Sequence, residues 1–195
     1  MLRSWPDVDT LFLGSNAGHG VALDLAACAV RTSVMVTLDS DAVPLGRGWL
    51  DPVVVPVQEG RALLAGLRSS RDFAHPVFCA VSTRTFLQQR LSFQAFVPPG
   101  VDADTVRWGE NAWDTAELLT RRLSPDDVVL VDATPNLVDG LPGMTTAGLV
   151  YHHGGVSRSS DGAVSDAAVV EWKQAIRALG LDVSLSAPRG ATVPP

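Results

Sequence analysis

The stretch VMVTLDSDAV, residues 34–43, joins an apolar run to two aspartates, Asp39 and Asp41, that one serine separates. The valine-rich half predicts a short buried strand over residues 34–38 that ends at the aspartates. Two carboxylates this close repel each other unless a cation lies between them, and Mg²⁺ or Mn²⁺ takes oxygen ligands while keeping positions for substrate phosphates. The stretch therefore predicts a metal–diphosphate site at a strand end. A plain turn, in which Asp accepts bonds from nearby backbone amides, is the alternative.

The rest of the chain alternates between strand-like and helix-like apolar patterns, which is typical of an α/β domain. Further strands are predicted over residues 10–14, 62–67, 75–81, 128–132 and 148–155, and helices over residues 18–32, 114–123 and 166–179. Pro52 and Pro56 each remove a backbone donor and so argue against a long regular helix between residues 48 and 60. We expect one domain over residues 1–195, with its core at about 7–180 and a frayed tail over 186–195.

Composition excludes several classes of protein. The 195 residues are 46% hydrophobic and 18% charged, which is typical of a globular chain with a real core. The net charge of −6, without a dense Lys/Arg cluster, argues against nucleic-acid binding. No apolar run is long enough for a membrane span, and the first residues lack a signal-peptide pattern, so we expect a cytoplasmic protein. We expect Cys28 and Cys79 to be buried thiols.

Several short motifs follow one another in a particular order. NAGHG, with Asn16 and Gly18, stands at a strand-to-helix turn before the D-x-D stretch, and PLGRGWLD, WDTAELLTRRL and VYHHGG come after it. In this order, over about residues 7–158, the motifs resemble glycosyltransferase family 2, the inverting nucleotide-sugar enzymes of the GT-A fold. The resemblance implies a GT-A-like mixed sheet flanked by helices. It also implies metal-dependent transfer of a sugar from a nucleotide-diphosphate donor to an acceptor hydroxyl.

The resemblance implies a metal site and assigns residues to it. Asp39 and Asp41 match the D-x-D and would hold Mn²⁺ or Mg²⁺ against the diphosphate, with Asp41 the more direct ligand. His152 or His153 would approach the same ion as a nitrogen ligand. Asn16 and Gly18, in the turn that opens the first helix, belong to the cofactor-binding side of the site. A polar strand end in solvent is the alternative reading of the two histidines.

Asp114 is the candidate catalytic base, because the family carries an acidic motif at the start of a later helix. Inverting transfer needs one carboxylate that takes the proton of the acceptor hydroxyl. The family has an acidic pair at this point, whereas Trp113 precedes Asp114 here, so Glu110 and Glu117 stay open as alternatives. Asp114 is also well placed to cap the predicted helix.

The resemblance also implies that the domain is shortened at its beginning. Family members open with a strand, a helix and a second strand that hold the base and the ribose, and this sequence starts at a point after them. A sheet without that strand has an open edge, which natural proteins normally cover. Three explanations stay open. A second copy or a partner chain completes the sheet, a shortened relative keeps only the acceptor and metal half, or the reading frame begins earlier.

Two other functions compete with transfer of a sugar. A degenerate GT-A-like domain would bind a sugar or a partner protein without catalysis. In the other, LDSDAV would be the nucleophile motif of haloacid-dehalogenase-like phosphatases, with Asp39 attacking phosphate and Asp41 acting as acid and base. That fold expects a downstream lysine near the site, and Lys173, in the last predicted helix, is the only lysine of the chain.

Overall fold

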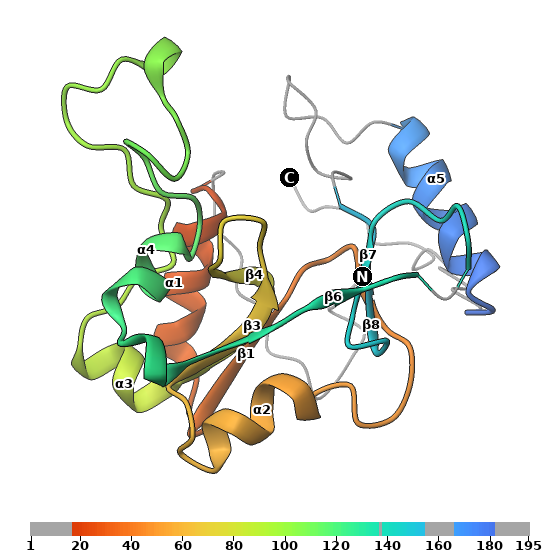
Figure 1. Ribbon diagram of the computed structural model, residues 1–195, viewed down its shortest axis with the longest axis horizontal. Coiled ribbons are helices and arrows are strands. Elements are labelled where there is room, and N and C mark those ends of the chain that lie inside the picture. Colours follow the sequence, from red (N-terminus) through yellow and green to blue (C-terminus); the bar gives the residue numbers. More distant parts are fainter. Residues whose placement is uncertain (1–16, 137, 155–165, 182–195) are drawn as a thin grey trace, which may run out of the picture.

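A computed structural model describes residues 17–136, 138–154 and 166–181, which form an α/β structure (Figure 1). Its larger element is a mixed four-stranded sheet in the order β1-β4-β3-β5. The strands are β1 (Val34–Leu38), β3 (Leu64–Arg68), β4 (Ala74–Ser82) and β5 (Val128–Val131). β4 runs antiparallel to both β1 and β3, and β5 runs parallel to β3, so β1, β3 and β5 all point the same way. The predicted α/β class and mixed sheet are confirmed.

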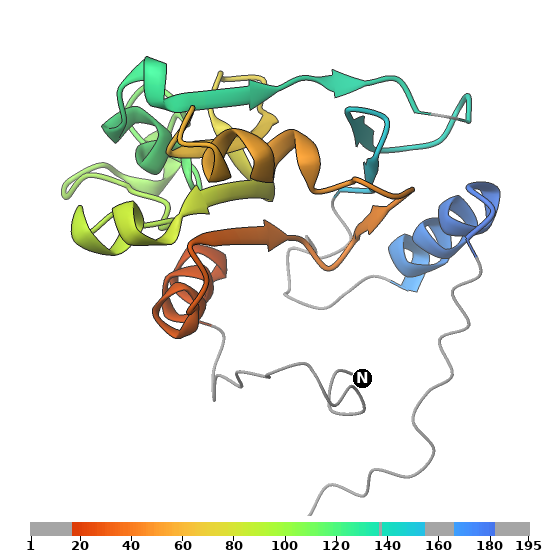
Figure 2. The same ribbon diagram turned by 90° about the horizontal axis from the view of Figure 1, so that it is seen from below.

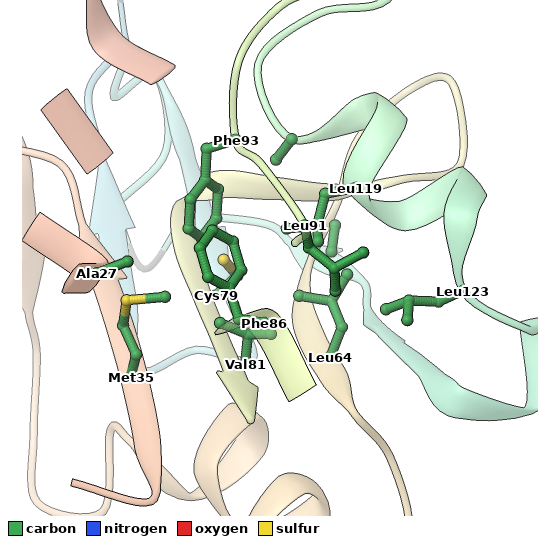
Figure 3. Close-up of a cluster of buried hydrophobic side chains, with 12 residues drawn as sticks. Ala27, Met35, Leu64, Cys79, Val81, Phe86, Leu91, Phe93, Leu119 and Leu123 are labelled. Carbon is green, nitrogen blue, oxygen red and sulfur yellow. The ribbon is translucent and has the colours of Figure 1, made fainter. Parts of the chain in front are cut away.

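Helices cover both faces of this sheet. α2 (Asp51–Gln58) lies on one face, and α1 (His19–Ala29), α3 (Thr83–Gln88) and α4 (Glu117–Arg122) lie on the other (Figures 1 and 2). The strands supply both layers because successive side chains alternate between faces. Leu64 packs toward α1, α3 and α4, whereas its neighbour Ala65 packs toward α2. Figure 3 shows the first of these layers, in which the rings of Phe86 and Phe93 stack with centroids 5.1 Å apart.

A second, antiparallel sheet adjoins the first. Its strands are β2 (Ala42–Pro44), β6 (Ala133–Thr134), β7 (Met144–Thr146) and β8 (Val150–His152), in the order β2-β8-β7-β6. The chain crosses from the first sheet to the second twice, once between β1 and β2 and once between β5 and β6 (Figure 2). Ala42 and Val150 of the second sheet share an apolar cluster with Val53 of α2 and Phe78 of β4, so a common core joins the two sheets. α5 (Asp166–Ala178) packs beside the second sheet through Ile176.

Several sequence expectations differ from the structure in detail. Between residues 48 and 60 only a short helix, α2, forms: Pro52 lies in its first turn, where no backbone donor is needed, and Pro56 lies inside it, two residues before its end at Gln58. α4 begins at Glu117 and Asp114 is not its cap, because Ala116 takes a left-handed conformation (φ 66°) that cannot belong to the helix. Cys79 is buried as expected, but Cys28 is exposed, since α1 turns that side outward. The predicted strand over 10–14 and the tail over 186–195 lie outside the described residues.

β1 forms one edge of the larger sheet within the described part of the chain. The helix beside it, α1, is apolar nearly all round, and Leu25 on its outer side is 45% exposed. A helix with apolar residues on every side is normally buried. This edge therefore has the character of a surface that another chain segment could cover. Among the described residues, no helix is both long and apolar enough to cross a membrane.

The β3–β4 pairing requires glycine at position 66. A Cβ atom there would lie 2.5 Å from the Cβ of Cys79 and 3.0 Å from the Cβ of Ala74. We expect Gly66→Ala to lower the free energy of unfolding by about 1–3 kcal/mol, the usual cost of overpacking a core. Urea denaturation measures this change. Gly46→Ala is the matched control, because no atom lies within 4 Å of its added Cβ. Equal stability of the two variants would contradict the prediction.

Candidate functional site

A cavity of about 770 Å³ opens where the strands of the larger sheet end. β1, β3 and β5 contribute residues at or just after their carboxyl ends, Asp39, Arg68 and Asp132, and the second sheet contributes Met144 and His152. Ligands of open α/β sheets gather at this end of the strands, and the volume lies in the ordinary range for small-molecule sites. The D-x-D stretch thus lies at the edge of a real cavity.

The cavity contains a compact group of candidate metal ligands. Oxygen atoms of Asp39 and Asp41 and a ring nitrogen of His152 all lie within 4.8 Å of one another. The sheet creates this proximity, because the β2–β8 register sets Ala42 opposite His152 and so brings the histidine beside Asp41. The His152 Nε2 atom lies 3.3 Å from the Asp41 Oδ1 atom. Asp39, Asp41 and His152, which the resemblance implied as ligands, therefore meet in one place.

The chemistry of this group suits a divalent cation. Two carboxylates and an imidazole are a usual donor set for Mn²⁺, and Mg²⁺ accepts the two carboxylates. Asp41 is only 8% exposed. Burial alone would raise the pKa of its carboxyl, but hydrogen bonds from the His152 ring and the backbone hold that pKa below its ordinary value of 3.8. Asp41 is therefore in the ionised form that a metal requires. The Nδ1 atom of His152 is buried and, within the described structure, has no hydrogen-bond partner.

His19 is a cavity residue to which sequence reasoning gave no role. It is the first residue of α1, and its Nε2 atom lies 3.3 Å from the Asp39 Oδ1 atom. The hydrogen bond with Asp39 raises the pKa of His19, although partial burial acts in the opposite direction. The NAGHG motif contains this histidine, but only the folded chain brings the start of α1 to the end of β1. Asp39 thus has a histidine neighbour of its own, as Asp41 has.

Gly18 and His153, two other residues that the resemblance implied, are not among the residues that line the cavity. Gly18 caps the start of α1 with φ 80°, its carbonyl oxygen accepts the Ala22 amide at 3.1 Å, and it is His19 that contributes to the cavity wall. Asn16 lies outside the described residues. His153 is buried apart from the metal-ligand group, with its Nδ1 atom 2.9 Å from the Tyr151 hydroxyl. Consecutive side chains at a strand end point to opposite faces, so only one of the two histidine rings can reach the Asp41 carboxylate.

Asp114 lines the same cavity, and its carboxylate is held in place by two donors. The Oδ2 atom accepts a bond from the Arg71 guanidinium at 3.1 Å, and the Oδ1 atom accepts the Thr115 amide at 2.8 Å. The Asp114 side chain is 36% exposed, so a ligand in the cavity can reach it. Of the other candidate bases, Glu117 has a fully buried side chain, and Glu110 is exposed to solvent and is not part of the cavity wall.

Glu117 is a structural carboxylate. Its oxygens accept bonds from Arg71, from Arg121 at 2.8 Å and from the Asp114 amide at 3.1 Å. Burial would raise the pKa of Glu117, but these bonds, that with Arg121 first, hold it below its ordinary value of 4.5. The geometry thus gathers the proposed metal ligands and Asp114 around one cavity, with the buried Glu117 behind Asp114.

In comparison with known proteins, no family model, curated protein or solved structure matches the chain.

The pairing of Glu117 predicts a pH-dependent loss of stability. We expect Glu117→Gln to lower the free energy of unfolding near neutral pH by about 2 kcal/mol, because charged hydrogen bonds are lost in a buried place. A carboxyl with a lowered folded pKa contributes stability above its ordinary value of 4.5 and loses that contribution as the pH falls through the folded value. The difference between the two proteins should therefore shrink in acid, as measured by urea denaturation over a pH series.

The control for this prediction is Glu59→Gln, which breaks an exposed ion pair with Arg61. Exposed pairs contribute between zero and about 1 kcal/mol, so this variant should change little. A difference between wild type and Glu117→Gln that stays constant from neutral pH into acid would contradict the prediction.

Proposed function

We propose that the chain is a GT-A-like, metal-dependent inverting glycosyltransferase that moves a sugar from a nucleotide-diphosphate donor to an acceptor hydroxyl. One observation carries the proposal. The metal-ligand group of Asp39, Asp41 and His152 and the carboxylate of Asp114 line a single cavity at the carboxyl ends of the strands. The reaction needs these two chemistries side by side, one for the leaving diphosphate and one for the acceptor proton.

Each group has a defined part in the proposed reaction. The acceptor oxygen bonds to the anomeric carbon while its proton passes to the Asp114 carboxylate. The bond between the anomeric carbon and the diphosphate oxygen breaks, and its electron pair leaves with the diphosphate. A Mn²⁺ or Mg²⁺ ion held by Asp39, Asp41 and His152 would neutralise charge on this leaving group. Asp114 is the supported base because it reaches the cavity, which the buried Glu117 cannot do.

The charge of the cavity supports dependence on a metal. The two arginines of the wall already pair with carboxylates, Arg68 with Asp72 and Asp132, and Arg71 with Asp114 and Glu117. Among the described residues of the wall, little positive charge is therefore left for a diphosphate, and the aspartates near it repel an anion. A bound divalent cation would reverse this balance at the point where the diphosphate enters.

A second candidate is a GT-A-like domain that binds a ligand or a partner chain without catalysis. In the described part of the chain the outer edge of β1 is unpaired and one apolar side of α1 is exposed, which favours this candidate because such a surface is normally covered. The two candidates differ in turnover. Only the first converts a nucleotide sugar.

Binding of nucleotides is expected to require the metal. In a thermal-shift titration with UDP, GDP and dTDP, one nucleotide should raise the melting temperature of the wild type only when MnCl₂ is present. At a ligand concentration of about 100 times Kd, the native state gains about 2.7 kcal/mol, which corresponds to a shift of several degrees. Asp41→Asn should abolish the shift, and Asp126→Asn, at an exposed position before β5, should keep it. No metal-dependent shift with any of the three nucleotides would contradict the proposal.

A further inference from the structure

Arg71 stands in a tight turn that fixes its position. The turn joins β3 to β4, and within it the Ser69 amide donates to the Phe73 carbonyl at 2.9 Å while Asp72 takes a left-handed conformation (φ 55°). The Arg71 amide also donates to the Ser69 hydroxyl at 3.1 Å. The Arg71 guanidinium lies over the Phe73 ring, 5.3 Å from its centroid. Backbone and ring together restrict where this side chain can go.

The guanidinium of Arg71 connects two carboxylates that differ greatly in exposure. It donates to the Asp114 Oδ2 atom at 3.1 Å and to the Glu117 Oε2 atom at 3.2 and 3.3 Å. The same Glu117 oxygen accepts the Asp114 amide. The buried Glu117 therefore holds Asp114 twice, directly through the backbone and through Arg71 at the carboxylate. Gly109 lies against this arrangement, because a Cβ there would be 2.8 Å from the Arg71 Cδ atom.

We propose that Arg71 is a positioning residue for Asp114. Arg71 orients the Asp114 carboxylate toward the part of the cavity where the acceptor hydroxyl would bind, while the buried Glu117 accepts bonds from both the Arg71 guanidinium and the Asp114 amide. This inference rests on the proposed function, in which Asp114 takes the acceptor proton. A planar guanidinium can serve two carboxylates at fixed angles, which an ammonium group cannot do equally well. The arrangement leaves Asp114 with acceptor capacity beyond its bonds from Arg71 and Thr115, since an ionised carboxylate has about four lone-pair sites.

A role in binding the donor phosphates fits Arg71 less well. Its charge is already matched by two carboxylates, and the metal-ligand group is made of other residues. A positioning role predicts loss of turnover with little change in donor affinity. A phosphate-binding role predicts the opposite.

The first test measures hydrolysis of UDP-, GDP- and dTDP-sugars in MnCl₂, with water as the acceptor. We expect Arg71→Gln to lower kcat roughly 10- to 100-fold and to leave KM for the nucleotide sugar within about threefold of wild type. Arg71→Lys should recover part of kcat, because lysine keeps the positive charge but lacks the planar guanidinium that bonds both carboxylates at once. Arg61→Gln, which removes an exposed arginine that pairs with Glu59 away from the cavity, is the control and should match wild type. An Arg71→Gln variant with wild-type kcat, or with a raised KM alone, would overturn the proposal.

A double variant separates positioning from a general structural effect. If Arg71 acts through Asp114, then Arg71→Gln should cause no further loss of kcat when Asp114 is already Asn. Losses that multiply would show that Arg71 acts independently of Asp114 and would overturn the proposal.

Hydrogen–deuterium exchange keeps the proposal testable even without turnover. Arg71→Gln should speed amide exchange over residues 113–118, where the bonds that hold Asp114 lie, and Arg61→Gln should not. Unchanged exchange in this segment would overturn the positioning role. Absence of wild-type hydrolysis with all donors, together with faster exchange in Arg71→Gln, would instead count against the proposed function and leave Arg71 as the residue that positions Asp114.

Discussion

The register between β2 and β8 is the constraint on which the candidate site depends. The D-x-D stretch ends one residue before β2, and His152 is the last residue of β8, so the pairing of Ala42 with His152 sets the histidine beside Asp41. A slip of one residue would turn every side chain of β8 to the opposite face. Tyr151 would then face the cavity and His152 would enter the apolar layer against α5. Three residues of backbone pairing thus decide which side chains a cation would meet.

Negative charge gathers at the seam, the junction where the chain passes from the larger sheet to the second sheet. The chain crosses this seam after β1 and again after β5, and each crossing carries acid, Asp39 and Asp41 in the first and Asp132 in the second. Carboxylates at such a density need counter-charges. Asp132 pairs with Arg68 at 2.6 Å, whereas in the described part of the chain the ion-pair partners of Asp39 and Asp41 are histidines at 3.3 Å. The D-x-D pair is therefore the part of the seam where charge is balanced least, and a divalent cation would balance it.

The sequence was informative where a feature depends on local pattern. The strand over residues 34–38 formed as predicted, because a short valine-rich run followed by turn residues has few alternatives. The choice between His152 and His153 could not be made, since it depends on the partner strand. The start of α4 was predicted three residues early, because nothing near Ala116 signals its left-handed conformation. The contacts of His19 with Asp39 and of Arg71 with Asp114 join segments that are distant in the chain, and no local pattern contains them.

The most direct measurement of the central claim is a crystal structure of the protein soaked in MnCl₂ with a bound nucleotide diphosphate, in which anomalous scattering from manganese locates the ion. The account predicts one strong anomalous peak between Asp39, Asp41 and His152, within ordinary coordination distance of their oxygen and nitrogen atoms and of a diphosphate oxygen. A nucleotide bound without a peak at this place, or a peak held by other residues, would contradict the account.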